Sequence, residues 1–282
     1  MAAIVSTQLF RFQRLGAAQL DLLQGAGAAG VELFCGRVSF DYHNRSQTEE
    51  LGNWFAANPL KLHSVHSPIY ADERDGRTGE MPLNIADTDP RRRVNALDEV
   101  ERVIEFSERA SFPLLIQHLG APRAEWNERM ADHALSSLER IRLLAKQAGI
   151  TVLVENIPNG LGEPQRLLPF LEVSHLEDVG ICFDTGHAHL AEHLFGGGGL
   201  ERSWEALSAR VRSTHIHDNH GTQDEHLWPG DGTIAWAEWL RKVPVSVPLV
   251  LEVTDLPGNH ELDLKQKLQD CFRQLENSRA ES

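Results

Sequence analysis

Cysteine is scarce in this sequence of 282 residues, which has three of them, at Cys35, Cys182 and Cys271. They are far apart, odd in number and form no Cys-x-x-Cys pair, so they do not make the framework of a small disulfide-linked protein. We expect them to be reduced thiols, which are typical of a cytoplasmic protein.

Long apolar runs are also missing from the sequence. No window approaches the roughly 20 consecutive apolar residues that cross a membrane. The N-terminal segment MAAIVSTQLFRFQRLG has no apolar run of the length found in a signal peptide. The sequence therefore predicts a protein without a membrane anchor.

Basic residues are outnumbered, because 27 lysines and arginines stand against 41 acidic residues and give a formal net charge of −14. An acidic surface repels the phosphate backbone of nucleic acids on average, which argues against nucleic acid as a partner. We expect a small-molecule partner, and the sequence is compatible with a homo-oligomer. The apolar fraction of 41% is enough for a sizeable core.

Short apolar runs alternate along the chain with longer segments of helical pattern. The runs begin about 35 residues apart on average, which suits a strand followed by a crossover helix. The eight runs are Ala3–Ser6, Val31–Phe34, Leu62–His66, Leu114–His118, Thr151–Glu155, Val179–Phe183, Arg212–His217 and Leu249–Val253. The helical segments are Gly16–Gly25, Thr48–Ala57, Pro90–Ala110, Trp126–Gly149, Pro164–Leu171, Glu201–Ala209, Ile234–Lys242 and Leu262–Glu276.

Eight strand–helix units without an internal break predict an α/β protein with a single (β/α)8 TIM barrel over residues 1–282. A doubly wound open sheet is the alternative, but it usually has fewer strands and a glycine-rich phosphate-binding turn after the first strand. No such turn follows Ala3–Ser6. In a barrel, the loops after the strands lie on the C-terminal face, where active sites are found.

Polar side chains stand where six of the apolar runs end. They are His66, His118, Glu155 with Asn156, Asp184 with His187, His215 with His217, and Glu252. A carboxylate at the end of an apolar strand is costly to bury unless it is paired or bound to a metal. If strands five to eight are neighbours, three carboxylates and one imidazole meet at one rim and need a cation among them. Mixed oxygen and nitrogen ligands suit Mn²⁺, Zn²⁺, Co²⁺ or Mg²⁺.

Each of these residues could instead be a separate buried hydrogen-bonding group. For a single residue such as His118 that interpretation is as good as a ligand role, but six strand ends of the same kind favour one shared site. Asp224 and His226, in the loop after the seventh run, would on their own be typical of a solvated loop. A ligand role is favoured for both because their loop follows His215.

Several phrases of the sequence together resemble the xylose isomerase-like barrel superfamily. They are SVHSP, QHLG, VLVEN, FDTGHAHL, HIHDN…DEHLWPGDGTIAW and LVLEV, in this order from the third strand to the eighth. That superfamily contains sugar and sugar-phosphate isomerases and epimerases, and also the endonuclease IV family of DNA repair enzymes. Each phrase is short, and their order and spacing make the resemblance specific for fold and metal binding rather than for one reaction.

The resemblance implies a set of ligands for each branch. In the epimerase branch, one metal is held by the residues that match Glu155, Asp184, His215 and Glu252. In the endonuclease branch three zinc ions are bound, and the matching residues are those four together with His66, His118, His187, Asp224 and His226. The sequence has a matching residue at all nine positions, so the expected cofactor is one to three divalent metal ions.

Three functions are open at this point. The first is a metal-dependent sugar or sugar-phosphate isomerase or epimerase, which removes a proton next to a carbonyl through a metal-stabilised enediolate. In it Glu155 and Glu252 are base and acid, and His187 polarises an oxygen. The candidate substrate-binding residues are Asn156, His217 and Trp228. The second function is a multinuclear zinc phosphodiester hydrolase of endonuclease IV type, and the third is a non-catalytic metal-binding barrel.

Overall fold

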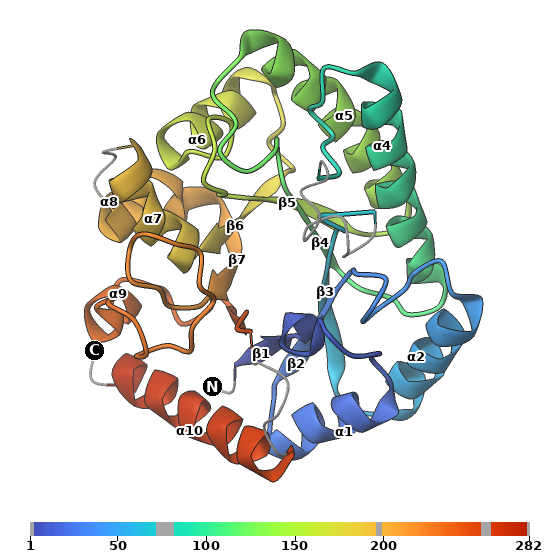
Figure 1. The fold of residues 1–282 in the computed structure, drawn as a ribbon, viewed down its shortest axis with the longest axis vertical. Coiled ribbons are helices and arrows are strands. Elements are labelled where there is room, and N and C mark those ends of the chain that lie inside the picture. The colour runs from blue at the N-terminus through green and yellow to red at the C-terminus, as the bar shows by residue number, and fades with distance from the viewer. Residues whose placement is uncertain (1–2, 72–81, 196–198, 255–260, 281–282) are drawn as a thin grey trace.

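The strands of this computed structural model form a closed parallel barrel in the order of the sequence (Figure 1). The structure describes residues 3–71, 82–195, 199–254 and 261–280. Each strand pairs with the next, and β1 closes the barrel by pairing with β8. The strands are β1 (Ile4–Ser6), β2 (Gly30–Phe34), β3 (Lys61–His66), β4 (Leu114–Gln117), β5 (Thr151–Glu155), β6 (Gly180–Asp184), β7 (Val211–Ile216) and β8 (Leu249–Leu251). The predicted (β/α)8 TIM barrel is confirmed, and a single domain over residues 1–282 stays a prediction.

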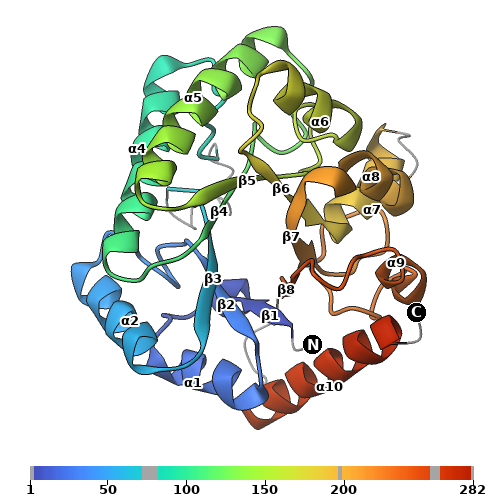
Figure 2. The same cartoon turned by 180° about the vertical axis from the view of Figure 1, so that it is seen from behind.

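Helices form an outer ring around the strands, as the two opposite views in Figures 1 and 2 show. Helix α1 lies beside α10, so the first and last helices are neighbours in the ring. None of the described helices has both the length and the hydropathy needed to cross a membrane. The helices are α1 (Ala17–Ala26), α2 (Arg45–Ala57), α4 (Pro90–Glu105), α5 (Glu128–Gln147), α6 (Pro164–Val173), α7 (Thr185–Phe195), α8 (Gly199–Leu207), α9 (Trp236–Leu240) and α10 (Glu261–Ala280), with short 3₁₀ helices η1 (Thr7–Phe10), η2 (Phe106–Glu108) and η3 (Ser208–Arg210).

Helix α4 shows how the sequence defines an element of this ring. Asp89 caps the helix, because its Oδ1 accepts hydrogen bonds from the backbone N–H groups of Arg91 and Arg92. Pro90 occupies the first turn, where its missing N–H costs nothing. The buried side chains of α4 recur at helical spacing and join the core; they are Ala96, Leu97, Glu99, Val100, Val103 and Ile104.

The main hydrophobic core lies between the strands and the helices, and a small second cluster stands apart from it. That second cluster consists of Ile116, Leu153 and Cys182. Leu153 precedes Glu155 by two positions, Cys182 precedes Asp184 by two, and alternate residues of a strand share one face. The small cluster therefore packs inside the barrel directly below the polar strand ends.

The connection after β6 differs from the prediction. The sequence pattern predicts a helix there only over Glu201–Ala209, but α7 already begins at Thr185, directly after the strand. Asp184 allows this abrupt start, because its Oδ1 accepts a hydrogen bond from the backbone N–H of His187, as an N-cap residue does. The glycine at position 186 has low helix propensity, which hides α7 from an analysis of sequence pattern.

Candidate metal centre

A cavity of about 330 Å³ lies at the C-terminal ends of the strands, the face on which the sequence places the site. Seven of the nine predicted ligands line this cavity: His66, His118, Glu155, His187, Asp224, His226 and Glu252. Asp184 and His215 lie deeper, and both are fully buried. The floor of the cavity is therefore built of carboxylates and imidazoles on an apolar support.

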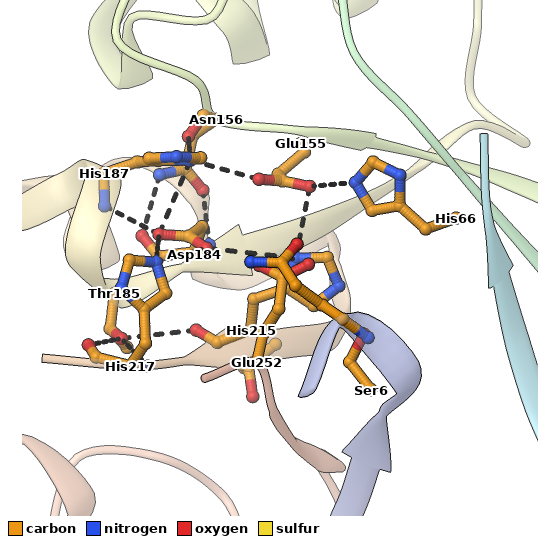
Figure 3. Close-up of polar contacts among 12 residues, drawn as sticks. Ser6, His66, Glu155, Asn156, Asp184, Thr185, His187, His215, His217 and Glu252 are labelled. Carbon is orange, nitrogen blue, oxygen red and sulfur yellow. Dashed lines mark hydrogen bonds and ion pairs between the residues drawn. The ribbon is translucent and has the colours of Figure 1, made fainter. Parts of the chain in front are cut away.

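Glu155, at the end of β5, is the centre of the arrangement (Figure 3). Its Oε2 lies 3.1 Å from His215 Nδ1, 3.3 Å from His66 Nε2 and 3.2 Å from His118 Nε2. Its Oε1 lies 3.0 Å from His187 Nδ1. Burial opposes ionisation of this carboxyl, but the charges of His118 and His215 outweigh it and hold the pKa of Glu155 well below its usual range.

Asp184, at the end of β6, is held from two sides. Its carboxylate lies 3.1 Å from His217 Nε2 and caps α7 through His187. Asn156 fixes its backbone, because the Asn156 amide donates to the carbonyl of Asp184 and the amide oxygen accepts from its N–H. Asn156 therefore orients a predicted ligand and is itself buried, with 1% of its surface exposed.

Glu252 follows β8 directly. Because β8 pairs with β7 on the side away from β6, Glu252 completes the rim on that side. Its Oε2 lies 3.4 Å from His215 Nδ1, and its backbone carbonyl accepts a hydrogen bond from His226 Nδ1 at 2.9 Å. Burial raises the pKa of Glu252 against the opposing charges of the two histidines.

The loop after β7 carries Asp224 and His226 to this rim, and Asp218 organises the loop. Its buried carboxylate accepts hydrogen bonds from four donors, the indole N–H of Trp236 and the backbone N–H groups of Asn219, Gly230 and Ile234. Backbone hydrogen bonds between Asp218 and Leu227 close the loop around these contacts. The segment DEHLWPGDG thus folds back on Asp218, and Asp224 and His226 of this segment line the cavity.

Asp224 and His226 lie close to His187, which is part of α7, and to His217, which follows β7. Asp224 Oδ2 lies 3.3 Å from His187 Nε2 and 3.4 Å from His226 Nε2. The His226 backbone adopts φ +49°, a left-handed conformation that costs energy for a residue other than glycine. Such strain is kept where the surroundings impose it, and here the loop holds His226 against His217.

Among the described residues, ligand atoms within 4.8 Å of one another form overlapping groups. The groups are Glu155–Asp184–His215, His66–His215–Glu252, His66–His118–Glu155, Asp184–His217–Glu252 and His187–His217–Asp224–His226. The structure thus brings all nine predicted ligands together. His217, which the sequence suggests as a substrate-binding residue, lies among the ligand atoms instead of lining the cavity.

The surroundings of His215 show that these residues fit a divalent ion. Its buried Nδ1 has no hydrogen-bond partner and faces oxygens of Glu155, Glu252 and Asp184 at 3.1, 3.4 and 3.9 Å. Its Nε2 lies 3.2 Å from Glu32 Oε2. When the ring is neutral and its proton is on Nε2, the Nδ1 lone pair faces three carboxylates. These negatively charged groups and the lone pair repel one another unless a cation lies between them.

Three residues near the cavity are not predicted from the sequence. Glu32 is a fully buried carboxylate within β2; burial would raise its pKa, but His215 lowers it to about 2. The signal for it was the acid in the apolar run GVELF. Gln8 and Arg11 follow β1 and line the cavity, and Gln8 Nε2 lies 3.0 Å from His226 Nδ1.

Trp228, a predicted substrate-binding residue, lies elsewhere. It is 5% exposed, packs in the main core and does not line the cavity. Lys267 Nζ covers its ring at 4.5 Å from the centroid. The aromatic side chains that do line the cavity, among the described residues, are those of Phe34 and Tyr70 together with the histidines.

The class of protein follows from these observations: a closed (β/α)8 barrel that gathers carboxylates and imidazoles at its C-terminal face. Residues 20–275 match the family described as the xylose isomerase-like TIM barrel, and the chain belongs to this family.

Two curated relatives illustrate how far the sequence similarity extends. An uncharacterised protein of Methanocaldococcus jannaschii is 29% identical over 168 residues, which cover 57% of this chain and 56% of that protein. The chain therefore matches little more than half the length of this relative. A probable endonuclease 4 of Mycoplasma pneumoniae is 21% identical over 196 residues, or 63% of this chain and 67% of that protein.

Solved structures share the fold over the whole chain. A D-tagatose 3-epimerase-like protein has a TM-score of 0.75 at 22% identity, with 100% of this chain and 99% of that chain covered. L-ribulose 3-epimerase has a TM-score of 0.76 at 14% identity, with 100% and 97% covered. The IOLI protein with a bound zinc atom has a TM-score of 0.72 at 14% identity, with 100% and 99% covered. At these identities the likeness shows the fold.

Proposed function

We propose that this protein is a metal-dependent isomerase or epimerase of a sugar or sugar phosphate. The observation that carries the proposal is the placement of Glu155 and Glu252, which reach the unpaired Nδ1 of His215 from β5 and from the end of β8 and both line one cavity. Two carboxylates on either side of one reaction centre suit the removal and return of a proton on carbon. The fold shared with sugar epimerases supports the same assignment.

The ion would be held by Glu155, Asp184, His215 and Glu252, and would be Mn²⁺, Zn²⁺, Co²⁺ or Mg²⁺. When bound, it would supply the Lewis acid that polarises the substrate carbonyl. Of the two glutamates, one removes the proton next to the carbonyl and the other returns a proton to the resulting enediolate. Both lie where water is largely excluded, since Glu155 is 1% and Glu252 is 2% exposed.

The remaining cavity residues bind and orient the sugar. His187 is placed to hydrogen-bond a substrate oxygen, because its ring lines the cavity between Glu155 and Asp224. Phe34 offers an apolar surface to the face of the sugar. A volume of about 330 Å³ is at the small end of ligand cavities, which suits a monosaccharide.

Two isosteric variants test the proposal. Glu155→Gln and Glu252→Gln should each lower turnover of a panel of keto sugars and keto-sugar phosphates about 10²- to 10⁴-fold. Metal content is measured on the same samples, so that loss of chemistry is separated from loss of the ion. Glu99→Gln is the control, because Glu99 is a buried carboxylate outside the cavity that binds Tyr42 and His43. Near-normal turnover in both cavity variants would refute the assignment.

A phosphodiester hydrolase of endonuclease type is the second candidate, and a different observation favours it. The groups His66–His118–Glu155 and His187–His217–Asp224–His226 could hold two further ions beside the first, more than an epimerase needs. Elemental analysis decides between them: one ion per chain favours the epimerase, whereas three zinc ions with salt-dependent binding of abasic-site DNA favour the hydrolase. A coordination shell closed by protein ligands alone would favour a non-catalytic metal-binding barrel.

A further inference from the structure

We propose that Glu32 is the positioning residue of the metal centre: it accepts the Nε2 proton of His215 and thereby directs the Nδ1 lone pair of that ring to the ion. The inference rests on the proposed metal site and assigns a function to a residue that does not line the cavity.

The geometry around Glu32 leaves few other arrangements. Its two oxygens lie 3.1 and 3.2 Å from His215 Nε2, and both side chains are fully buried. Both carboxylate oxygens of Glu32 face this one ring nitrogen, and carboxylate oxygens accept hydrogen bonds, so we infer that Nε2 carries the proton. The other nitrogen of the ring, Nδ1, then faces Glu155 and Glu252.

A second contact fixes Glu32 itself. The Ser64 hydroxyl donates a hydrogen bond of 2.7 Å to Glu32 Oε2, and the two residues are directly paired in register between β2 and β3. The carboxylate is therefore held by the barrel wall and approaches His215 from across the barrel interior. This is the hydrogen-bonded carboxylate that typically fixes the orientation and tautomer of a metal-binding histidine.

The competing explanation is that Glu32 serves only to balance a permanently cationic His215. An imidazolium carries protons on both ring nitrogens, so it would satisfy Glu32 and Glu155 together and could not bind an ion through Nδ1. The two explanations differ in one observable, the protonation of Nδ1 when metal is present.

The direct experiment is nitrogen NMR of the full chain, labelled in its histidines and loaded with Zn²⁺. We expect His215 to carry its proton on Nε2 and none on Nδ1. A proton on Nδ1 of His215 in the zinc-loaded protein would overturn the inference. Because this measurement uses the unaltered chain, it does not depend on whether a variant folds.

Substitution gives a second, independent measurement by calorimetric titration with Zn²⁺ or Co²⁺ alone. Glu32→Gln should weaken binding of the first ion about 10- to 100-fold and change the visible spectrum of bound Co²⁺, and Glu32→Asp should recover part of the loss. Ser64→Ala is the matched control, since it leaves the carboxylate in place, and should change affinity less than Glu32→Gln does. Unchanged affinity and spectrum in a folded Glu32→Gln protein would also overturn the inference.

The outcomes separate this inference from the function proposed above. If Glu32→Gln binds metal normally while Glu155→Gln still loses activity, the epimerase proposal stands and only the role of Glu32 fails. If the unaltered chain binds neither Zn²⁺ nor Co²⁺, the metal-dependent function fails with it.

Discussion

The rings of His217 and His226 are stacked, with centroids 4.0 Å apart and planes inclined by 20°. One comes from the end of β7 and the other from the loop that follows, and Asp224 lies beside both. With His187 they form the largest group of ligand atoms in the described part of the chain. The stack therefore marks a place where protons and metal ions compete.

Protons and metal ions compete for the ring of His226. Burial would lower the pKa of His226, but the charge of Asp224 raises it to about 9, so the metal-free protein holds a proton there at neutral pH. A metal ion that binds through the His226 ring must displace this proton. Affinity for Zn²⁺ should therefore fall about tenfold per pH unit for each displaced proton as pH drops below 9. Calorimetry in buffers of different ionisation enthalpy counts the protons; release of none at pH 7 would contradict the prediction.

The same raised pKa predicts how the metal-free protein responds to alkali. A folded pKa above the unfolded value stabilises the fold fully below about pH 6.5, and the contribution is lost as pH rises through about 9. Thermal unfolding with a chelator present should therefore show a lower melting temperature at pH 9.5 than at pH 6.5. Asp224→Asn removes the charge that raises the pKa, so that its melting temperature should change less between these two pH values.

Arg11 gives a prediction about the substrate. It is the only lysine or arginine among the described residues that line the cavity, and its buried Nε has no hydrogen-bond partner. Its guanidinium lies over the Phe12 ring at 5.2 Å from the centroid and forms no ion pair with a carboxylate of the described residues, and we expect it to bind an anionic group of the substrate. We expect Arg11→Met to raise KM for a keto-sugar phosphate about 10- to 100-fold and to leave KM for the unphosphorylated sugar unchanged.

The control for Arg11 is Arg14→Met. Arg14 stands three residues further on, pairs with Glu50 at 2.6 Å and does not line the cavity, so its loss should change neither KM. If Arg11→Met changes KM equally for the phosphorylated and the unphosphorylated sugar, Arg11 does not bind the phosphate.

The sequence predicts those parts of the site that depend on strand ends. His66, Glu155 and Asp184 end apolar runs, and the barrel topology brings such ends to one face whatever the details of packing. Glu32 is not predicted in this way because it lies inside its strand and not at the end of it. Its partners Ser64 and His215 are 32 and 183 positions away, and no local pattern relates them.

The direction of a loop side chain is also hidden in the sequence. Trp228 follows His226 by two residues and could turn to the cavity or to the core, and the pattern does not distinguish them. The structure places it in the core because Asp218 folds the loop back on itself. The sequence thus indicates which residues are close to the site, whereas hydrogen bonds to one buried carboxylate decide which way they face.

That role of Asp218 can be tested by removing its carboxylate. Asp218→Ala leaves four donors without their acceptor, and we expect a loss of about 3 kcal/mol in the free energy of unfolding. Because Asp224 and His226 lose their support, the variant should also bind less metal per chain than the unaltered protein. Asp21→Ala, which deprives only the Trp54 indole of its acceptor, should cost about 1 kcal/mol and leave metal content unchanged.

The start of α7 supplies the sharpest steric prediction. A Cβ on Gly186 would lie 1.9 Å from Cε1 of His217, far inside contact distance, so Gly186→Ala must displace the ring. Alanine favours a helix over glycine by up to about 1 kcal/mol, and the variant should nevertheless melt at a lower temperature and bind less Zn²⁺. Gly25→Ala in α1 is the control, because its nearest neighbour is the flexible end of Lys265 at 3.4 Å, and it should be neutral or stabilising. Undiminished zinc binding by Gly186→Ala would mean that the His217 ring is not required where the structure places it, and the group of four ligands would have to be reduced to His187, Asp224 and His226.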